Sequence, residues 1–296
     1  MTPQPPGNRD KDAGRWSDLG RPPLNATALR RALVRPGSLW TSLDVVPATG
    51  STNTDLAERA SKGAAEGAVL VAEEQSAGRG RLDRTWSAPP RSGLFFSVYL
   101  TPRVPAARWG WLPLLAGVAT ATALTRTAGV DTALKWPNDL LVTVEGAERK
   151  AGGILAERTD GGVVVGIGLN VTLTADELPV PTAGSLALAG ARTTDRDPLL
   201  RAVLRSLEHW YGEWQTADGD PEASGLQATY AAGCATLGRE VRAELPGDTS
   251  LTGEAVAIDG DGRLVLATGE GVQQPVGAGD IIHLRATGGN GAERPE

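Results

Sequence analysis

The segment from Ala77 to Trp86, AGRGRLDRTW, combines three arginines with two glycines. Glycines let backbone N–H groups come close to a phosphate, and guanidinium groups pair with phosphate or carboxylate oxygens through parallel hydrogen bonds. Trp86 closes the segment and offers a ring on which a base could stack. The segment matches neither a Walker A loop nor a dinucleotide-binding fingerprint. Composition alone therefore leaves two interpretations open, an anion-binding loop and a flexible surface loop.

A second polar segment, KWPND, runs from Lys135 to Asp139 and directly precedes an apolar strand. Asn138 and Asp139 at the start of a strand are typical of a turn, which is the favoured interpretation of the segment in isolation. An aspartate beside several Arg and Lys side chains would also suit Mg²⁺, which prefers carboxylate, water and phosphate oxygens.

Two later apolar strands carry glycines together with a single polar residue, KAGGIL at 150–155 and GIGLN at 166–170. Glycine inside a strand leaves room for a ligand or another backbone beside it. Lys150 lies at the start of such a strand, and this position favours a functional role for it over that of a solvated surface charge. A buried Asn170 needs hydrogen-bond partners, which a nucleotide or a neighbouring strand could supply.

The hydrophobic pattern predicts the elements that position these segments. Strands are expected at 68–73, 94–100, around Lys135, and at 140–144, 151–157 and 163–171. Helices are expected at 51–61 and 112–127, and from the Asp197-Pro198 helix start, the last with an apolar face of Leu199, Leu200, Val203, Leu204, Leu207, Tyr211 and Trp214. Residues 74–92 show no periodicity. Because strands and helices are grouped rather than strictly alternating, the order predicts an α+β fold with a mixed sheet flanked by helices.

The two ends of the chain differ from its middle. The first 23 or so residues are rich in Pro, Gly and charge, which predicts a disordered leader, followed by a short helix that Asn25 caps and Pro36 stops. From Gly233 short strands separated by Gly and Asp predict a small β-barrel. We therefore expect a leader with a short helix (1–38), a large domain that contains the polar segments (39–232), the barrel (233–286) and a flexible tail (287–296).

Composition narrows the classes of function. The chain has 35 acidic and 29 basic residues, so its net charge of −6 gives no electrostatic reason to expect general nucleic-acid binding. A single cysteine, Cys234, rules out an internal disulfide framework, and the two distant histidines disfavour triad chemistry. The N-terminus lacks an apolar signal, and no apolar run reaches the ~20 residues of a membrane span. These features predict a cytoplasmic protein that binds neither DNA nor a membrane.

Taken in chain order, these segments resemble the biotin protein ligase family, in the form that lacks an N-terminal DNA-binding domain. The resemblance covers about residues 43–285 and ends on GDIIHLR, 279–285, in the predicted barrel, which resembles that family's SH3-like domain. It implies that residues 39–232 form a catalytic domain that binds biotin and ATP. One position departs from the family pattern, because members typically carry glycine where this loop has Asp83. The matching segments are Ser51-Thr52-Asn53, Gln75 with the Gly-Arg loop, KWPND, KAGGIL and GIGLN.

The resemblance implies a two-step reaction. The carboxylate of biotin attacks the α-phosphate of ATP, in the presence of Mg²⁺, to give biotinyl-5′-AMP. A lysine of the biotin carboxyl carrier domain of an acyl-CoA carboxylase, such as acetyl-CoA carboxylase, then attacks the mixed anhydride and releases AMP. The enzyme is expected to be a monomer or a weak homodimer.

The resemblance also implies roles for individual residues. Catalysis falls to Lys150, Arg79 and Arg81, and Mg²⁺ binding to Asp139. ATP binding falls to Trp86, Lys135, Asn138 and Asn170. Biotin binding falls to Ser51, Thr52, Asn53, Gln75, Arg79, Gly80, Arg81, Lys150 and Gly153.

Three other functions remain open at this point. A lipoate–protein ligase would use similar adenylation chemistry on a related fold. A biotin-responsive repressor would need a DNA-binding domain, for which the leader before residue 40 is too short. A non-enzymatic nucleotide-binding module would bind ATP without releasing pyrophosphate.

Overall fold

The computed structural model describes residues 20–283 apart from positions 83, 246, 248, 270, 278 and 279, and describes only the backbone of Asp280. The expected flexible tail and Asp83 lie outside the described residues, as does the leader up to residue 19. Every helix in the described part of the chain is too short or too polar to span a bilayer.

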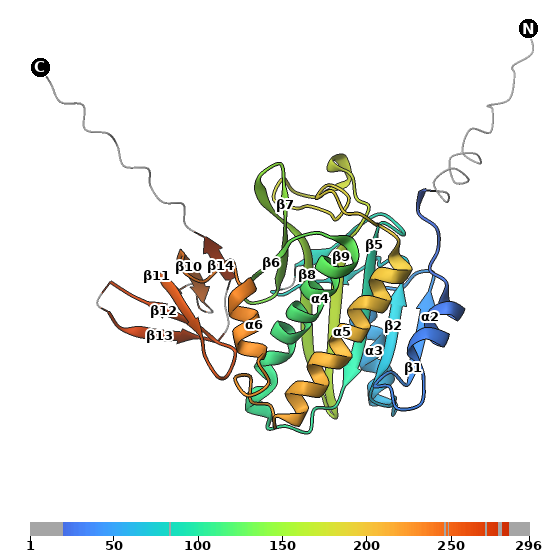
Figure 1. Ribbon diagram of the computed structural model, residues 1–296, viewed down its shortest axis with the longest axis horizontal. Helices are drawn as coiled ribbons and strands as arrows, with labels where there is room; N and C mark the ends of the chain where they lie inside the picture. The colour runs from blue at the N-terminus through green and yellow to red at the C-terminus, as the bar shows by residue number, and fades with distance from the viewer. Residues whose placement is uncertain are drawn as a thin grey trace, which may run out of the picture.

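A seven-stranded mixed sheet forms the centre of the molecule (Figure 1). Its first two strands pair in parallel, and all its other neighbours are antiparallel. The central strands are mostly apolar and almost entirely buried, because both faces of the sheet are covered. The spatial order is β1 (Ser42–Val46), β2 (Ala68–Ala72), β5 (Gly93–Leu100), β9 (Gly162–Asn170), β8 (Ala147–Thr159), β7 (Asp139–Val144) and β6 (Thr132–Lys135).

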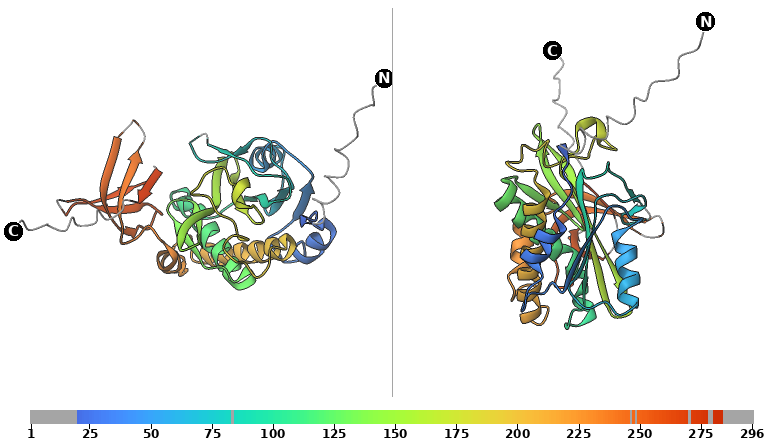
Figure 2. Two further views of the ribbon diagram at one scale, coloured as in Figure 1. Left: turned by 90° about the horizontal axis from the view of Figure 1, so that it is seen from above. Right: turned by 90° about the vertical axis from the view of Figure 1, so that its right-hand side faces the viewer.

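Helices cover both faces of this sheet. The long helices α4 (Trp111–Ala128) and α5 (Arg196–Thr216) pack together on one face, and α3 (Thr52–Ser61) packs on the other, as the right-hand view of Figure 2 shows. The buried face of α5 contains all seven apolar residues that the sequence predicted. The helix begins at Arg196 with Asp195 as its N-cap, whereas the sequence placed the cap at Asp197. The predicted α+β class, with helices flanking a mixed sheet, is confirmed.

The C-terminal part of the described chain is a five-stranded antiparallel sheet. Its order is β13 (Gln273–Val276), β12 (Leu264–Ala267), β11 (Thr249–Ile258), β10 (Glu240–Leu245) and β14 (Asp280–His283). Within the described residues β13 and β14 form its two edges, so hydrogen bonds do not close it into a barrel. Its apolar side chains belong to the same core cluster as those of the large sheet. The SH3-like character expected from the sequence is compatible with this open arrangement.

Hydrogen bonds from two tryptophans connect the large domain to the C-terminal sheet. Trp136 donates its indole N–H to the Gly262 carbonyl at 3.0 Å, and its backbone N–H to Thr236 Oγ1 at 3.1 Å. Trp111 donates in the same way to the Gly260 carbonyl at 2.9 Å. Helix α6 (Leu226–Gly233) leads into the C-terminal sheet and packs beside α4. The small sheet is therefore held in one place against the end of the large one.

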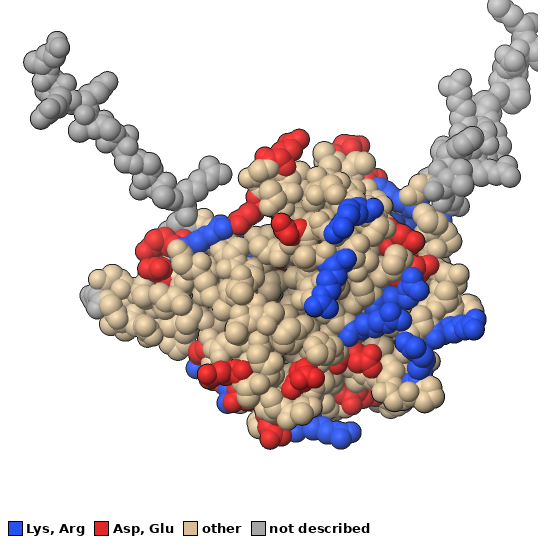
Figure 3. Space-filling model, viewed as in Figure 1, with Lys and Arg blue, Asp and Glu red and all other residues tan. Residues whose placement is uncertain are grey.

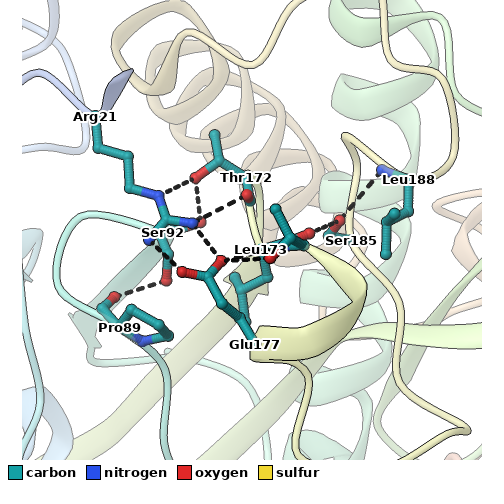
Figure 4. Close-up of polar contacts among 9 residues, drawn as sticks. Arg21, Pro89, Ser92, Thr172, Leu173, Glu177, Ser185 and Leu188 are labelled. Atoms are coloured by element: carbon teal, nitrogen blue, oxygen red, sulfur yellow. Dashed lines mark hydrogen bonds and ion pairs between the residues drawn. The ribbon is translucent and has the colours of Figure 1, made fainter. Parts of the chain in front are cut away.

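The segment ahead of the first strand is fixed more firmly than the sequence indicated. Arg21 donates to Thr172 Oγ1 at 3.0 Å and forms an ion pair with Glu177 of a short 3-10 helix, η2 (Ala175–Glu177) (Figure 4). Pro22 accepts a hydrogen bond from Arg196 at 2.6 Å. The prediction of disorder to about residue 23 is therefore wrong for residues 21–23.

The short helix expected after the leader is present as α2 (Ala26–Leu33). The side chain of Asn25 caps it, as predicted, by accepting from the backbone of Ala28 at 3.0 Å. Leu29 and Leu33 are buried against the rest of the core. The structure describes this single complete helix between residue 20 and β1.

Charge is spread unevenly over the surface. On the face shown in Figure 3, Lys and Arg side chains gather over the half that α5 and α2 occupy in Figure 1. A net charge of −6 therefore does not prevent the chain from carrying a basic face. For this reason the composition argument against nucleic-acid binding stays a prediction.

Candidate active site

One cavity, of about 320 Å³, collects nearly all the residues that the sequence singled out. Its walls come from the start of α3, the Gly-Arg loop, the turn between β6 and β7, the glycine-containing strands β8 and β9, and the C-terminal sheet. Among the residues predicted for a site, those that line it are Ser51, Thr52, Asn53, Gln75, Arg79, Gly80, Arg81, Trp86, Lys135, Asn138, Asp139, Lys150 and Gly153.

Asn170 is the exception, because it does not line the cavity. Its side chain is buried and donates to the Gly184 carbonyl at 2.9 Å. This is the structural alternative that the sequence left open, with a neighbouring segment rather than a nucleotide as the partner. We therefore withdraw Asn170 from the residues proposed to bind ATP.

Neutral polar side chains build one end of the cavity. Thr52 donates to Gln75 Oε1 from its backbone at 2.8 Å and from its hydroxyl at 3.1 Å. Ser97 Oγ lies 2.7 Å from Thr52 Oγ1 and 2.6 Å from Asn53 Oδ1. Ser51 precedes α3 and makes no capping hydrogen bond with its side chain. These groups form a buried hydrogen-bonding surface without formal charge.

Gly166 lines this end of the cavity and Ser97 supports it from behind, although neither residue was assigned a binding role from the sequence. Ser97 is the polar residue of the otherwise apolar strand GLFFSVYL, which is a signal that could have identified it. A Cβ added at Gly166 would lie only 2.1 Å from Asn53 Oδ1. The glycine is required because the Asn53 amide lies directly against its backbone.

The Gly-Arg loop is folded into a small hairpin, although its sequence predicted a segment without regular structure. Strands β3 (Gly78–Arg79) and β4 (Thr85–Trp86) pair in antiparallel, and Gly80 donates to the Arg84 carbonyl at 2.7 Å. This hairpin lays Trp86 over the glycines of β8 and β9. A Cβ at Gly168 would be 3.0 Å from the indole ring, and one at Gly153 would be 3.5 Å from it.

The indole N–H of Trp86 is buried and has no hydrogen-bond partner in the described structure. A buried donor without a partner costs free energy, about 1–3 kcal/mol in typical cases. The Lys150 ammonium lies 6.0 Å from the centroid of the same ring. A ligand ring that stacks on Trp86 would therefore lie close to the Lys150 ammonium.

Lys150 forms an ion pair with Asp139, with 2.6 Å between Nζ and Oδ1. Both side chains remain partly exposed to the cavity, 36% for the lysine and 21% for the aspartate. The pair bears on the predicted Mg²⁺ site, because a metal at Asp139 would compete with Lys150 for the carboxylate. The described residues contain no group of three or more His, Cys, Asp or Glu that could hold a metal. Mg²⁺ therefore fits here as a companion of ATP phosphates rather than as a resident ion.

Asn138 holds the KWPND segment against β8. Its side chain donates to the Ile154 carbonyl at 2.8 Å, and Ile154 donates back to the Asn138 carbonyl at 2.9 Å. Arg81 reaches the Asn138 side-chain oxygen at 3.5 Å. Asn138 thus connects the turn, the strand and the Gly-Arg loop.

The cavity wall is strongly cationic. Two acidic residues, Asp139 and Glu244, also line it, so positive charge is in excess on a chain whose net charge is negative. Such a wall favours ligands with more than one negative charge. The basic residues of the wall are Arg79, Arg81, Arg84, Lys135 and Lys150.

The C-terminal sheet contributes the last part of the wall, through Glu244, Ile281 and Ile282. Nearby, His283 lies between Arg239 at 3.1 Å and Thr236 at 3.2 Å. Burial, with the positive charges of Lys135 and Arg239, lowers the pKa of His283 to about 4. The imidazole is therefore neutral near pH 7.

Comparison with known proteins gives a consistent result. The biotin/lipoate A/B protein ligase family matches residues 45–173, and the biotin protein ligase C-terminal domain matches residues 236–284. A biotin–[acetyl-CoA-carboxylase] ligase of Mycobacterium tuberculosis is 44% identical, with 90% of this chain and 98% of that protein aligned. The bifunctional ligase/repressor BirA of Bacillus subtilis is 34% identical, with 78% of this chain and 70% of that protein aligned.

Among solved structures, the biotin protein ligase from Aquifex aeolicus in complex with biotin and ATP has a TM-score of 0.67 and 26% sequence identity. The match covers 83% of this chain and 100% of that one. The extent and identity of these matches establish that the chain belongs to the biotin protein ligase family.

Proposed function

We propose that this chain is a biotin protein ligase. It activates biotin with ATP to biotinyl-5′-AMP and transfers biotin to a lysine of the biotin carboxyl carrier domain of an acyl-CoA carboxylase. One observation carries the proposal, namely that a buried neutral polar surface and a cluster of cations lie at two parts of one cavity. Biotin has the matching character, with a neutral ureido group at one end and a carboxylate at the other.

In the first step a biotin carboxylate oxygen forms a bond to the α-phosphorus of ATP, and the bond to pyrophosphate breaks. Two anions must approach each other for this to happen, so the main requirement is positive charge in fixed positions. Lys150 is proposed to neutralise charge where the carboxylate meets the phosphate. Arg79 and Arg81 flank the same region and hold the carboxylate and phosphates in place. Mg²⁺ enters with the ATP phosphates.

In the second step the neutral ε-amine of the carrier lysine attacks the carbonyl of the anhydride, and AMP leaves. No histidine or cysteine lies among the described residues of the cavity wall. This agrees with direct transfer, which needs no covalent intermediate on the enzyme. Trp86 is proposed to stack on the adenine, with Lys135 and Asn138 on the phosphate side. Closing the Gly-Arg loop excludes water from the anhydride.

The neutral end of the cavity favours biotin over lipoate. Thr52, Asn53 and Gln75 are polar groups at this end, and a ligand with no complementary donors or acceptors leaves such groups unsatisfied. The ureido group of biotin offers both donors and an acceptor, whereas the dithiolane ring of lipoate offers neither. A lipoate–protein ligase is therefore the second candidate.

Pyrophosphate release tests the proposal. We expect the purified chain to release pyrophosphate from ATP when biotin is added, and much less with lipoate or with no acid. Addition of a biotin carboxyl carrier domain should then give a biotinylated lysine. ATP binding without pyrophosphate release would instead identify a nucleotide-binding module. Faster release with lipoate would identify a lipoate ligase.

A further inference from the structure

Glu157 connects two parts of the cavity that are far apart in the sequence. It lies on β8, where it pairs in register with Val164 of β9. One carboxylate oxygen, Oε2, accepts from Asn53 Nδ2 at 2.8 Å, and the other, Oε1, pairs with Arg79 at 2.9 Å. The Glu157 side chain is 28% exposed. A single carboxylate therefore holds both the amide of the neutral end and a guanidinium of the cationic end.

Glu157, together with the Leu155 carbonyl, also determines how the Asn53 amide is oriented. Asn53 Nδ2 has two hydrogens, and the Leu155 carbonyl at 3.1 Å and Glu157 take both. The amide oxygen therefore faces Ser97, at 2.6 Å. The only hydrogen-bonding capacity that Asn53 then has left is a second acceptor lone pair on Oδ1. Turned this way, Asn53 can accept an N–H group from a ligand but cannot donate to one.

Arg79 depends on the same carboxylate for its position. Its side chain is 49% exposed and belongs to a loop that carries two further arginines, Arg81 and Arg84. Like charges in one short hairpin repel each other, and Glu157 supplies Arg79 with an opposite charge on a rigid strand. An exposed pair of this kind is weak, so a carboxylate or phosphate that binds in the cavity can share the guanidinium or take it over.

We propose that Glu157 is a positioning residue that sets both the acceptor orientation of Asn53 and the resting position of Arg79. The inference rests on the proposed function, since it assigns Asn53 to biotin and Arg79 to the carboxylate and phosphates. It adds to that function a residue outside the motifs of the sequence, and a physical link between recognition of the two ends of the ligand.

Two substitutions separate the two contacts. In Glu157→Gln the amide oxygen still accepts from Asn53, but the ion pair with Arg79 is lost. In Glu157→Ala both contacts are lost. The matched control is Glu148→Gln. Glu148 lies on the same strand, but its carboxylate pairs with Arg239 and does not line the cavity. Thermal unfolding of each variant verifies that it is folded.

Biotin binding is measured by calorimetry without ATP, and KM and kcat by pyrophosphate release. Glu157→Gln should raise the KM for ATP about tenfold and the Kd of biotin, whose carboxylate Arg79 also holds, by a smaller factor than Glu157→Ala does. Glu157→Ala should raise both by about tenfold, which corresponds to ~1.4 kcal/mol each. The kcat at saturating substrates should change by less than about threefold, and Glu148→Gln should match the parent.

Several results would overturn the inference. A folded Glu157→Ala variant that binds biotin as the parent does would show that Asn53 does not depend on the carboxylate. A fall in kcat at saturating substrates, with unchanged KM values, would place Glu157 in the chemical step. If the parent itself neither binds biotin nor releases pyrophosphate, the proposed function fails, and the inference fails with it.

Discussion

Lys150 and Asp139 form a close ion pair although they are not cross-strand neighbours. In the β7–β8 ladder Asp139 pairs with Gly153 and Lys150 with Leu141, and a bulge interrupts the register at Ala151. Cross-strand partners share a face of a sheet, and so do residues two apart in a strand. The extra residue therefore brings Lys150 to the same face as Asp139, and thus into the cavity, as bulges beside active sites commonly do.

Lys150→Ala should abolish most of the adenylation activity. Loss of one preorganised charged group at the reacting atoms typically lowers kcat by about 100-fold or more. The measurement is pyrophosphate release with saturating biotin and ATP. The control is Lys62→Ala, an exposed lysine at the C-cap of α3 that pairs only with Glu58 in the described contacts. Near-normal release by a folded Lys150→Ala variant would remove Lys150 from the mechanism.

Gly166→Ala and Gly168→Ala should damage different ends of the site. A Cβ at Gly166 meets Asn53 Oδ1 at 2.1 Å, whereas a Cβ at Gly168 meets the Trp86 ring at 3.0 Å. The first variant should weaken biotin binding by at least about tenfold, because the amide must move. The second should mainly raise the KM for ATP. Each variant serves as the control for the other, and the same change in both parameters for both variants would contradict the assignment.

Removing Arg21 should destabilise the protein without changing the chemistry. The Arg21→Ala variant loses the ion pair with Glu177 and the hydrogen bonds to Thr172, and we expect a loss of about 1 kcal/mol in the free energy of unfolding. The hydrogen bond from Arg21 lowers the pKa of Glu177 from its ordinary 4.5. A depressed carboxylate pKa contributes stability above its unfolded value, and that contribution is lost as the pH falls through the folded value.

The difference in thermal stability between parent and Arg21→Ala should accordingly be largest near neutral pH and shrink below about pH 4.5. Arg31→Ala, an exposed arginine on α2 with no ion pair among the described contacts, is the control. A stability difference that does not vary with pH would mean that Arg21 acts through packing rather than through Glu177.

His283 should make the protein less stable in mild acid. Its folded pKa of about 4 lies below the ordinary value of 6.5, because burial, Lys135 and Arg239 oppose its protonation, against an opposite effect of Glu148. The unfolded chain therefore binds more protons between these two values, so stability is full above pH 6.5 and falls as the pH drops toward 4. The pKa of Glu148 is lowered, mainly by its hydrogen bond from Arg239, so protonation of Glu148 also reduces stability near the bottom of this range.

Thermal unfolding between pH 7 and 5 tests this prediction. His283→Gln keeps a donor and an acceptor for Thr236 and Arg239 but cannot take up a proton in this range. The variant should show a flatter dependence of melting temperature on pH than the parent. Identical slopes for the two proteins would show that the pH dependence comes from other groups.

Much of this protein is determined by local sequence. The apolar face of α5, the Asn25 cap and the buried central strands follow from residue type and spacing, because periodicity and capping act over a few neighbouring residues. The order of the polar segments was enough to indicate the family. It also identified most of the residues that line the cavity.

Only the tertiary structure decided which of these residues meet and through which partners. Asn53 and Glu157 are 104 positions apart, and nothing in the local pattern of either residue indicates the other. Asn170 has the local pattern of a ligand contact, yet the fold supplies it with the Gly184 carbonyl instead. The C-terminal Glu244 and Ile281 reach the cavity because the tryptophan contacts hold the two sheets together. Such contacts depend on sheet order, register and the packing of one layer on another, which join residues remote in the chain and leave no periodic signal along it.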